Sequence, residues 1–110
     1  FHGCDETLLY ALMMGAVGGV GLLYNLLPKT ILGIYEAFQA GKFREANEQQ
    51  LQLSAFINFF LRHAEGNAVG LAKGVMAGLG FSCGQARSPN PPISKESVDR
   101  VIQAAKKFWT

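Results

Sequence analysis

The feature that most constrains this chain is an uncharged run of 22 residues, which begins at Thr7 and follows two adjacent acids. A run of that length meets the requirement for a membrane-spanning helix. Gly15 and Gly19 form a small-xxx-small pair, the spacing that allows membrane helices to make close contact. One interpretation is therefore a small membrane-inserted or helical interaction module, in which residues 7–27 form a single apolar helix.

The glycines inside the run favour a different interpretation. Four glycines fall within seven residues and precede an asparagine: Gly15, Gly18, Gly19, Gly21 and Asn25. This density indicates a change of secondary structure rather than one continuous helix. We predict a helix from Thr7 to Met14 that stops at Gly15, followed by a buried strand from about Gly19 to Tyr24. The cluster lacks the spacing of a phosphate-binding loop, and it precedes the strand, so we expect it to serve close backbone packing.

The two acids before the run, Asp5 and Glu6, are open to two interpretations. They lie where a short strand would end and a helix would begin, and the N-terminal dipole of a helix favours acidic residues there. Asp5 is a candidate N-cap on this interpretation. The two carboxylates could equally accept hydrogen bonds from a ligand. The spacing alone favours the helix-start interpretation.

The remaining chain predicts helices separated by one extended segment. We expect a helix over residues 28–41 and a longer one that begins at Phe43, then a helix over residues 68–79. Residues 81–93 are rich in proline, glycine and serine and predict an extended crossing segment, after which Ser94 caps a final helix. The apolar stripe of the longer helix contains Ala46, Gln50, Leu53, Ile57 and Phe60.

The composition limits the size and the setting of the protein. The 110 residues make at most one small domain, and 49% hydrophobic against 16% charged residues is more apolar surface than such a monomer hides comfortably. We therefore expect a partner or the rest of a larger protein. The chain begins with Phe1 and shows no signal-peptide pattern, so we expect a fragment of a cytoplasmic protein.

Charge and metal-ligand patterns exclude two classes of function. The net charge of +2 comes from scattered basic residues, so nucleic acid is not an expected partner. Cys4 and Cys83 lack metal-ligand spacing and are expected to be free thiols in a reducing compartment. His2 and His63 are far apart in the sequence, and we assign no metal site.

The order of the expected elements predicts an α/β fold. A strand end, two acids, a helix, a buried strand and another helix follow the βαβα order of an α/β barrel. Chemistry in such barrels takes place at the C-terminal ends of the strands, so Gly3, Asp5 and Glu6 would lie in an active-site loop.

Short stretches of the chain resemble a known family. They are residues 3–9 (GCDETLL), 14–21 (MGAVGGVG) and 24–25 (YN), with weaker similarity over residues 36–42, at Ala46 and Gln50, around Lys73 and over residues 87–89. These stretches are similar to the seventh and eighth strand regions of the pyruvate-dependent class I aldolases, the family of N-acetylneuraminate lyase and dihydrodipicolinate synthase. The Gly-x-Asp-Glu motif favours the N-acetylneuraminate lyase branch.

The resemblance implies the fold and the oligomeric state. The family subunit is a TIM (β/α)8 barrel with a three-helix C-terminal extension, usually in a tetramer. This chain would be its last third and mostly α-helical. Residues 1–41 would supply the end of strand 7, helix 7, strand 8 and helix 8, and residues 42–110 the helical extension.

The resemblance also implies a chemistry. In the family, a lysine on strand six forms a Schiff base with pyruvate and a tyrosine on strand five relays protons, without a further cofactor. Both would lie before residue 1, so this chain would contain no catalytic residue and would be inactive alone. By motif position, Gly3, Asp5 and Glu6 match residues that hold the hydroxyls of a 2-oxo sugar acid. Carboxylates suit this role, because they accept strong hydrogen bonds. Val20 matches an apolar position beside the pyruvyl group, and Leu22 occupies the place of a substrate-contacting serine.

Overall fold

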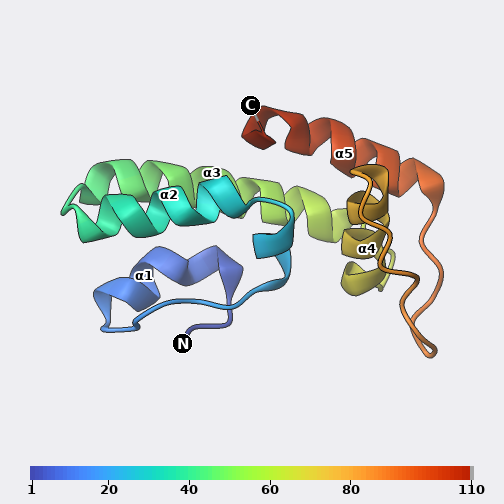
Figure 1. The fold of residues 1–110 in the computed structure, drawn as a ribbon, viewed down its shortest axis with the longest axis horizontal. Helices are drawn as coiled ribbons and strands as arrows, with labels where there is room; N and C mark the ends of the chain where they lie inside the picture. The colour runs from blue at the N-terminus through green and yellow to red at the C-terminus, as the bar shows by residue number, and fades with distance from the viewer. Residues whose placement is uncertain (110) are drawn as a thin grey trace. The chain divides into compact units, whose positions relative to one another are not determined.

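The computed structural model describes residues 1–109, and these are mostly helical, as predicted (Figure 1). Short 3-10 helices and longer α-helices follow one another in the order η1 (Asp5–Thr7), α1 (Leu8–Met13), η2 (Leu22–Asn25), α2 (Pro28–Gln39), α3 (Phe43–Arg62), α4 (Ala68–Gly78) and α5 (Lys95–Trp109). The chain forms two compact units, one of residues Phe1–Ile57 and one that begins at Asn58. The division therefore falls within α3, and the expected division between residues 41 and 42 stays a prediction.

The prediction of a strand over residues 19–24 is wrong. A single parallel bridge between His2 and Gly19 takes its place, followed by η2. Two backbone bonds of 2.9 Å form the bridge, from His2 N to the carbonyl of Gly18 and from Val20 N to the carbonyl of His2. An isolated pair of strands is marginally stable, and parallel sheets are stable only with both faces covered. The residues that follow the bridge therefore bond to one another in a 3-10 helix.

The first helix is one residue shorter at its C-terminal end than predicted and begins with a 3-10 turn. η1 leads directly into α1, and Gly15 beyond its end has a φ of +98°, the left-handed backbone that suits glycine. The predicted stop at Gly15 is confirmed. The alternative of one apolar helix over residues 7–27 is wrong, because residues 14–21 form no helix. Within residues 1–109, no helix is both long enough and apolar enough to cross a membrane.

α2 and α3 confirm the predictions for residues 28–41 and for the helix from Phe43. Pro28 occupies the first turn of α2, where a missing N–H breaks no hydrogen bond. Gly41, with a φ of +72°, lies in the short turn before α3. α3 buries every residue of the predicted apolar stripe, Gln50 included. The core of the first unit draws on α1, η2, α2 and α3, and its fully or almost fully buried side chains include Leu9, Leu23, Ile34 and Leu53.

In the second unit, α5 packs across α4 (Figure 1). Gly74 and Gly78 of α4 face Val98 and Ile102 of α5, and a Cβ at Gly74 would lie only 2.7 Å from Val98 Cγ2. The two glycines therefore allow the helices to approach more closely than larger residues would. The buried side chains at this contact include Leu71, Val75, Val101 and Ala105.

The segment over residues 81–93 has no regular structure, as predicted. Lys73 of α4 holds it, because its Nζ donates to the carbonyls of Cys83 and Gln85 at 3.3 and 3.4 Å. The long lysine side chain thus satisfies backbone groups that an extended segment leaves without partners of its own.

α4 and α5 are each capped by the side chain of the residue that precedes the helix. Asn67 Oδ1 accepts a hydrogen bond of 2.7 Å from Gly70 N, and Asn67 Nδ2 donates to the carbonyl of Pro91. Ser94 Oγ accepts a bond of 3.2 Å from Ser97 N, which confirms the predicted cap of α5. These side chains satisfy N–H groups that the first turn of each helix leaves unpaired.

Glu65 ties the turn after α3 to the start of α5. Its Oε1 accepts hydrogen bonds from the hydroxyls of Ser94 and Ser97, the latter at 2.6 Å. Its backbone φ is +51°, an uncommon conformation for a residue with a side chain. The Ser94 bond, and secondly the Ser97 bond, lower the pKa of Glu65.

Candidate functional site

The five residues to which the resemblance gives a binding role lie on two neighbouring segments of the first unit. Gly3, Asp5 and Glu6 belong to the segment that runs into η1, and Val20 and Leu22 to the segment that runs into η2. The bridge between His2 and Gly19 joins the segments. Asp5 is buried, Glu6 and Leu22 are partly exposed, and Gly3 and Val20 are exposed.

Asp5 uses its carboxylate to hold the second segment. Its Oδ2 accepts a hydrogen bond of 2.9 Å from Leu23 N, and only 8% of the residue is exposed. The interpretation of Asp5 as the N-cap of the first helix is therefore wrong: the residue before α1 is Thr7, and its side chain makes no capping bond. Burial raises the pKa of Asp5, and the Leu23 bond opposes that rise.

Glycines allow the second segment to lie directly against these side chains. A Cβ at Gly21 would overlap the Asp5 carboxylate, and one at Gly19 would overlap the Tyr24 hydroxyl. The predicted role of the glycine cluster, close backbone packing, is confirmed at both positions. Among the described residues, the buried Tyr24 hydroxyl has no hydrogen-bond partner. Burial raises the pKa of Tyr24, and the charge of Asp5 raises it further.

Two polar side chains of α3 hold the first segment from its other side. Gln50 Oε1 accepts a bond of 2.9 Å from Leu9 N, and Gln50 Nε2 donates to the carbonyl of Asp5 at 3.1 Å. Ser54 Oγ donates to the carbonyl of Glu6 at 3.2 Å. The main chain at both acids is therefore bonded to α3.

Sequence reasoning did not assign a role to Gln50, Ser54 or Tyr24. The signal for Gln50 was present, because a glutamine on an otherwise apolar helix face must find hydrogen-bond partners in the core. Its partners could not be deduced, because they lie 41 and 45 residues away in the sequence. Tyr24 belongs to one of the stretches that carry the family resemblance.

Glu6 is the more accessible of the two carboxylates. It is partly exposed, and its Oε2 accepts a weak hydrogen bond from the Cys4 thiol at 3.2 Å. A carboxylate has about four acceptor positions, so Glu6 has capacity for the hydroxyl groups of a polyol. Cys4 and Cys83 are exposed free cysteines, as predicted. In residues 1–109, no group of three or more His, Cys, Asp or Glu side chains could hold a metal ion.

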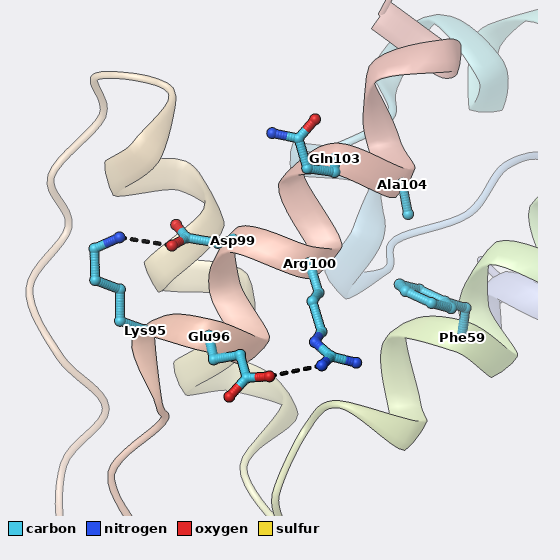
Figure 2. Close-up of a pocket in the computed structure, with 7 residues that line it drawn as sticks. All are labelled: Phe59, Lys95, Glu96, Asp99, Arg100, Gln103 and Ala104. Carbon is cyan, nitrogen blue, oxygen red and sulfur yellow. Dashed lines mark hydrogen bonds and ion pairs between the residues drawn. The ribbon is translucent and has the colours of Figure 1, made fainter.

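A pocket in the second unit is lined by none of these residues (Figure 2). Its charges are paired along α5, with Lys95 Nζ 2.6 Å from Asp99 Oδ2 and Arg100 Nη2 2.6 Å from Glu96 Oε1. Exposed pairs at this spacing contribute little to stability and hold charges that a ligand would otherwise use. The pocket is lined by Phe59, Lys95, Glu96, Asp99, Arg100, Gln103 and Ala104. The candidate site is therefore placed at the two segments of the first unit.

Comparison with known proteins identifies the family of the chain. The profile of the dihydrodipicolinate synthetase family matches residues 1–108. The chain belongs to this family. Within the dihydrodipicolinate synthetase family, it is 40% identical over 107 residues to the N-acetylneuraminate lyase of Pongo abelii and 39% identical over 107 residues to that of Homo sapiens. Each match covers 96% of this chain and 33% of the relative, so the chain spans about a third of their length.

Solved structures give the same result. The wild-type sialic acid aldolase of Ruminococcus gnavus superposes with a TM-score of 0.87 at 28% identity, over 99% of this chain and 36% of the other. The N-acetylneuraminate lyase of Fusobacterium nucleatum superposes with a TM-score of 0.83 at 27% identity, over 96% of this chain and 35% of the other. The resemblance to the aldolase family is therefore confirmed.

Proposed function

We propose that this chain is the C-terminal part of a Schiff-base aldolase that cleaves or forms a 2-oxo sugar acid, with pyruvate as one product. The match over 107 residues to N-acetylneuraminate lyases, at up to 40% identity, is the observation that carries the proposal. Residues 1–41 belong to the end of a TIM barrel and residues 42–110 to its helical extension. The complete enzyme is a cytoplasmic homo-oligomer, a tetramer as in the family.

The candidate site binds the sugar part of the substrate. Glu6 supplies a partly exposed carboxylate for the substrate hydroxyls, and Gly3 leaves room beside it. Asp5 shares this role through the carboxylate oxygen that does not bond to Leu23. Val20, which is 69% exposed in this chain, contacts the apolar side of the pyruvyl group.

Catalysis requires residues beyond this chain. A Schiff-base mechanism needs a lysine with a lowered pKa in a pocket with a proton relay. The lysines of this chain do not match the family lysine in position, so pyruvate binds covalently to the preceding part of the enzyme. The isolated chain is therefore inactive.

A hybrid enzyme tests the proposal. In this hybrid, the chain replaces the matching residues of the Pongo abelii N-acetylneuraminate lyase. We expect the hybrid to cleave N-acetylneuraminate, and borohydride to trap pyruvate on the part that comes from the relative. The isolated chain should trap none. A folded hybrid that forms no pyruvate adduct, or an adduct on a lysine of this chain, would contradict the proposal.

Leu22 adjusts the choice of substrate. It begins η2, and it follows directly on Gly21, which lies beside the Asp5 carboxylate. Leucine offers no partner to a substrate hydroxyl, and an unpaired hydroxyl costs about 1–3 kcal/mol, or about five- to a hundredfold in affinity. We expect the enzyme to prefer an acceptor aldehyde that is less hydroxylated than N-acetylmannosamine or differently oriented. In the hybrid, Leu22→Ser should raise kcat/KM for N-acetylneuraminate several-fold, and an unchanged value would refute this role.

A further inference from the structure

Gln50 and Ser54 bond to three main-chain groups of one loop, which here means η1 and the start of α1 (residues 5–9). Gln50 is 1% exposed, and its side-chain amide bonds to Leu9 N and to the carbonyl of Asp5. It also donates to Ser54 Oγ at 3.4 Å, and the Ser54 hydroxyl donates to the carbonyl of Glu6. Two consecutive carbonyls, those of the two acids, are thus bonded to adjacent turns of α3. We call these two side chains the α3 clamp.

The α3 clamp places the polar side chain of Gln50 among buried apolar residues, where a polar group without hydrogen bonds would destabilise the fold. Gln50 occupies an apolar stripe in which Leu53 and Ile57 are also buried. An unpaired polar group there would be strongly destabilising, so the glutamine is tolerated only while the loop keeps the conformation that satisfies it. The start of α1 could have been capped locally by the side chain of Thr7, but it is not. The loop is therefore fixed from α3 rather than by its own sequence.

The clamp acts on both segments of the site. Gln50 holds the main chain of Asp5, and the Asp5 side chain in turn holds Leu23 N on the second segment. Ser54 holds the main chain of Glu6, whose side chain is the accessible carboxylate. A hydrogen-bonded carbonyl restrains the backbone of its residue, and with it the position from which the side chain of that residue extends.

We propose that Gln50 and Ser54 are positioning residues, which aim the Glu6 carboxylate at a hydroxyl of the sugar-acid substrate. This inference rests on the proposed function, because it names how the same site holds its substrate. Neither side chain touches substrate, and the effect is transmitted through the main chain at Asp5 and Glu6. Loss of a hydrogen bond between a charged group and a ligand weakens binding by about tenfold or more.

The hybrid enzyme separates positioning from catalysis. Gln50→Met keeps the length of the side chain without its hydrogen bonds, and Ser54→Ala removes only the bond to the carbonyl of Glu6. We expect each to raise KM for N-acetylneuraminate, by about tenfold or more for Gln50→Met, with kcat and the rate of pyruvate trapping by borohydride almost unchanged. Gln52→Met is the matched control, because Gln52 lies exposed on the same helix.

A conservative variant tests the mechanism further. In Gln50→Glu, the ionised carboxylate still accepts a bond from Leu9 N but has no hydrogen to donate to the carbonyl of Asp5. If the clamp acts through the loop, this variant should keep the start of α1 protected from amide hydrogen exchange while KM still rises. A KM equal to that of the unmodified hybrid in Gln50→Met and Ser54→Ala would overturn the inference.

The outcomes of the two proposals are distinguishable. A hybrid without a pyruvate adduct speaks against the proposed function, whereas an active hybrid with an unchanged KM speaks only against the clamp. Hydrogen exchange in the 110-residue chain gives a test that needs no activity. There, Gln50→Met should accelerate exchange at the Leu9 amide and Gln52→Met should not, and equal exchange in the two variants would overturn the inference.

Discussion

The two compact units hold their helix starts in different ways. In the second unit, Asn67 and Ser94 each bond to an amide only three residues further along the chain. In the first unit, the amide of Leu9 at the start of α1 bonds to Gln50, a separation of 41 residues. The first arrangement is local, and the second needs most of the unit to be folded.

This difference shows what each region is suited for. The caps of α4 and α5 act over three residues, although Asn67 also bonds to Pro91 and Ser94 also bonds to Glu65. A distant cap makes a loop depend on several elements at once. The loop at Asp5 and Glu6 is bonded both to α3 and, through the Asp5 carboxylate, to Leu23. Such support on several sides would hold the geometry of this loop if, as we propose, it binds substrate.

The largest loss of unfolding free energy is expected from a substitution in the core of the second unit, because local caps alone cannot stabilise that fold. Leu71 of α4 is completely buried, and Leu71→Ala should lower the free energy of unfolding by about 2–5 kcal/mol through lost burial and a cavity. Urea denaturation followed by circular dichroism measures this. Val69→Ala on the same helix is the control, since Val69 is 47% exposed and should change stability by less than about 0.5 kcal/mol. Equal effects would mean that α4 is not packed as described.

We expect a smaller loss of unfolding free energy when a side chain is added at Gly21, where the backbone of the first unit lies directly against the Asp5 carboxylate. Gly21→Ala places a Cβ on the Asp5 carboxylate and 2.8 Å from Tyr24 Cε1, so the bond from Leu23 N to Asp5 must shift. Overpacking of this kind costs about 1–3 kcal/mol in unfolding free energy, again measurable with urea. Gly18→Ala is the matched control, because its Cβ would lie 3.4 Å from Phe1 Cε1 and a small movement of that exposed ring relieves it. If the two variants were equally stable, the close approach would have no energetic role.

The same contrast explains how much of the fold the sequence predicted. The helices α2 to α5 were predicted almost to their ends, because their apolar periodicity and their caps are local signals. The Ser94 cap and the glycine stop at Gly15 belong to this class. Each of these features depends on residues a few positions apart, which a single sequence displays directly.

The prediction was wrong where distant residues decide the structure. An apolar run over residues 19–24 suits a buried strand, yet in this chain only one bridge forms and η2 follows, because no further strand is present among the described residues to pair with it. Asp5 was favoured as a helix cap, and it bonds instead to Leu23, 18 residues away. The site residues themselves came from the family resemblance, while the bonds by which Gln50 and Ser54 support them appeared only in the structure.

Removal of the side chain that caps α4 should lower the unfolding free energy moderately. Asn67→Ala removes the bond to Gly70 N and the bond to the carbonyl of Pro91, and we expect a loss of about 1 kcal/mol in unfolding free energy. Asn67→Asp should recover part of the loss, because its carboxylate still accepts from Gly70 N. The control is Asn58→Ala at an exposed position within α3, where alanine is the better helix former and stability should not fall. A loss at Asn58 as large as at Asn67 would argue against the cap.

A change of pH should have the smallest effect on the free energy of unfolding. It should act in opposite directions at Asp5 of the first unit and at Glu65 of the second. Burial raises the pKa of Asp5 above its ordinary value of 3.8, so the folded state binds this proton more tightly than the unfolded state does. Acidification through the raised pKa therefore adds stability at Asp5. The serine hydrogen bonds lower the pKa of Glu65 below its ordinary value of 4.5, so its contribution is present above 4.5 and is lost as the pH falls through the lowered pKa. The two carboxylates thus respond to acid in opposite directions.

Urea midpoints of the isolated chain, measured from neutral pH down to about pH 3, separate the two contributions when each carboxylate is neutralised in turn. In Asp5→Asn, the gain on acidification is removed, so stability should fall more steeply with decreasing pH than in the unmodified chain. In Glu65→Gln, the loss is removed, so the fall should be shallower. Glu48→Gln is the control for the loss of a surface carboxylate, because the exposed pair of Glu48 with Arg44 contributes little to stability. If Asp5→Asn and Glu65→Gln changed the slope in the same direction, the opposite environments assigned to the two carboxylates would be wrong.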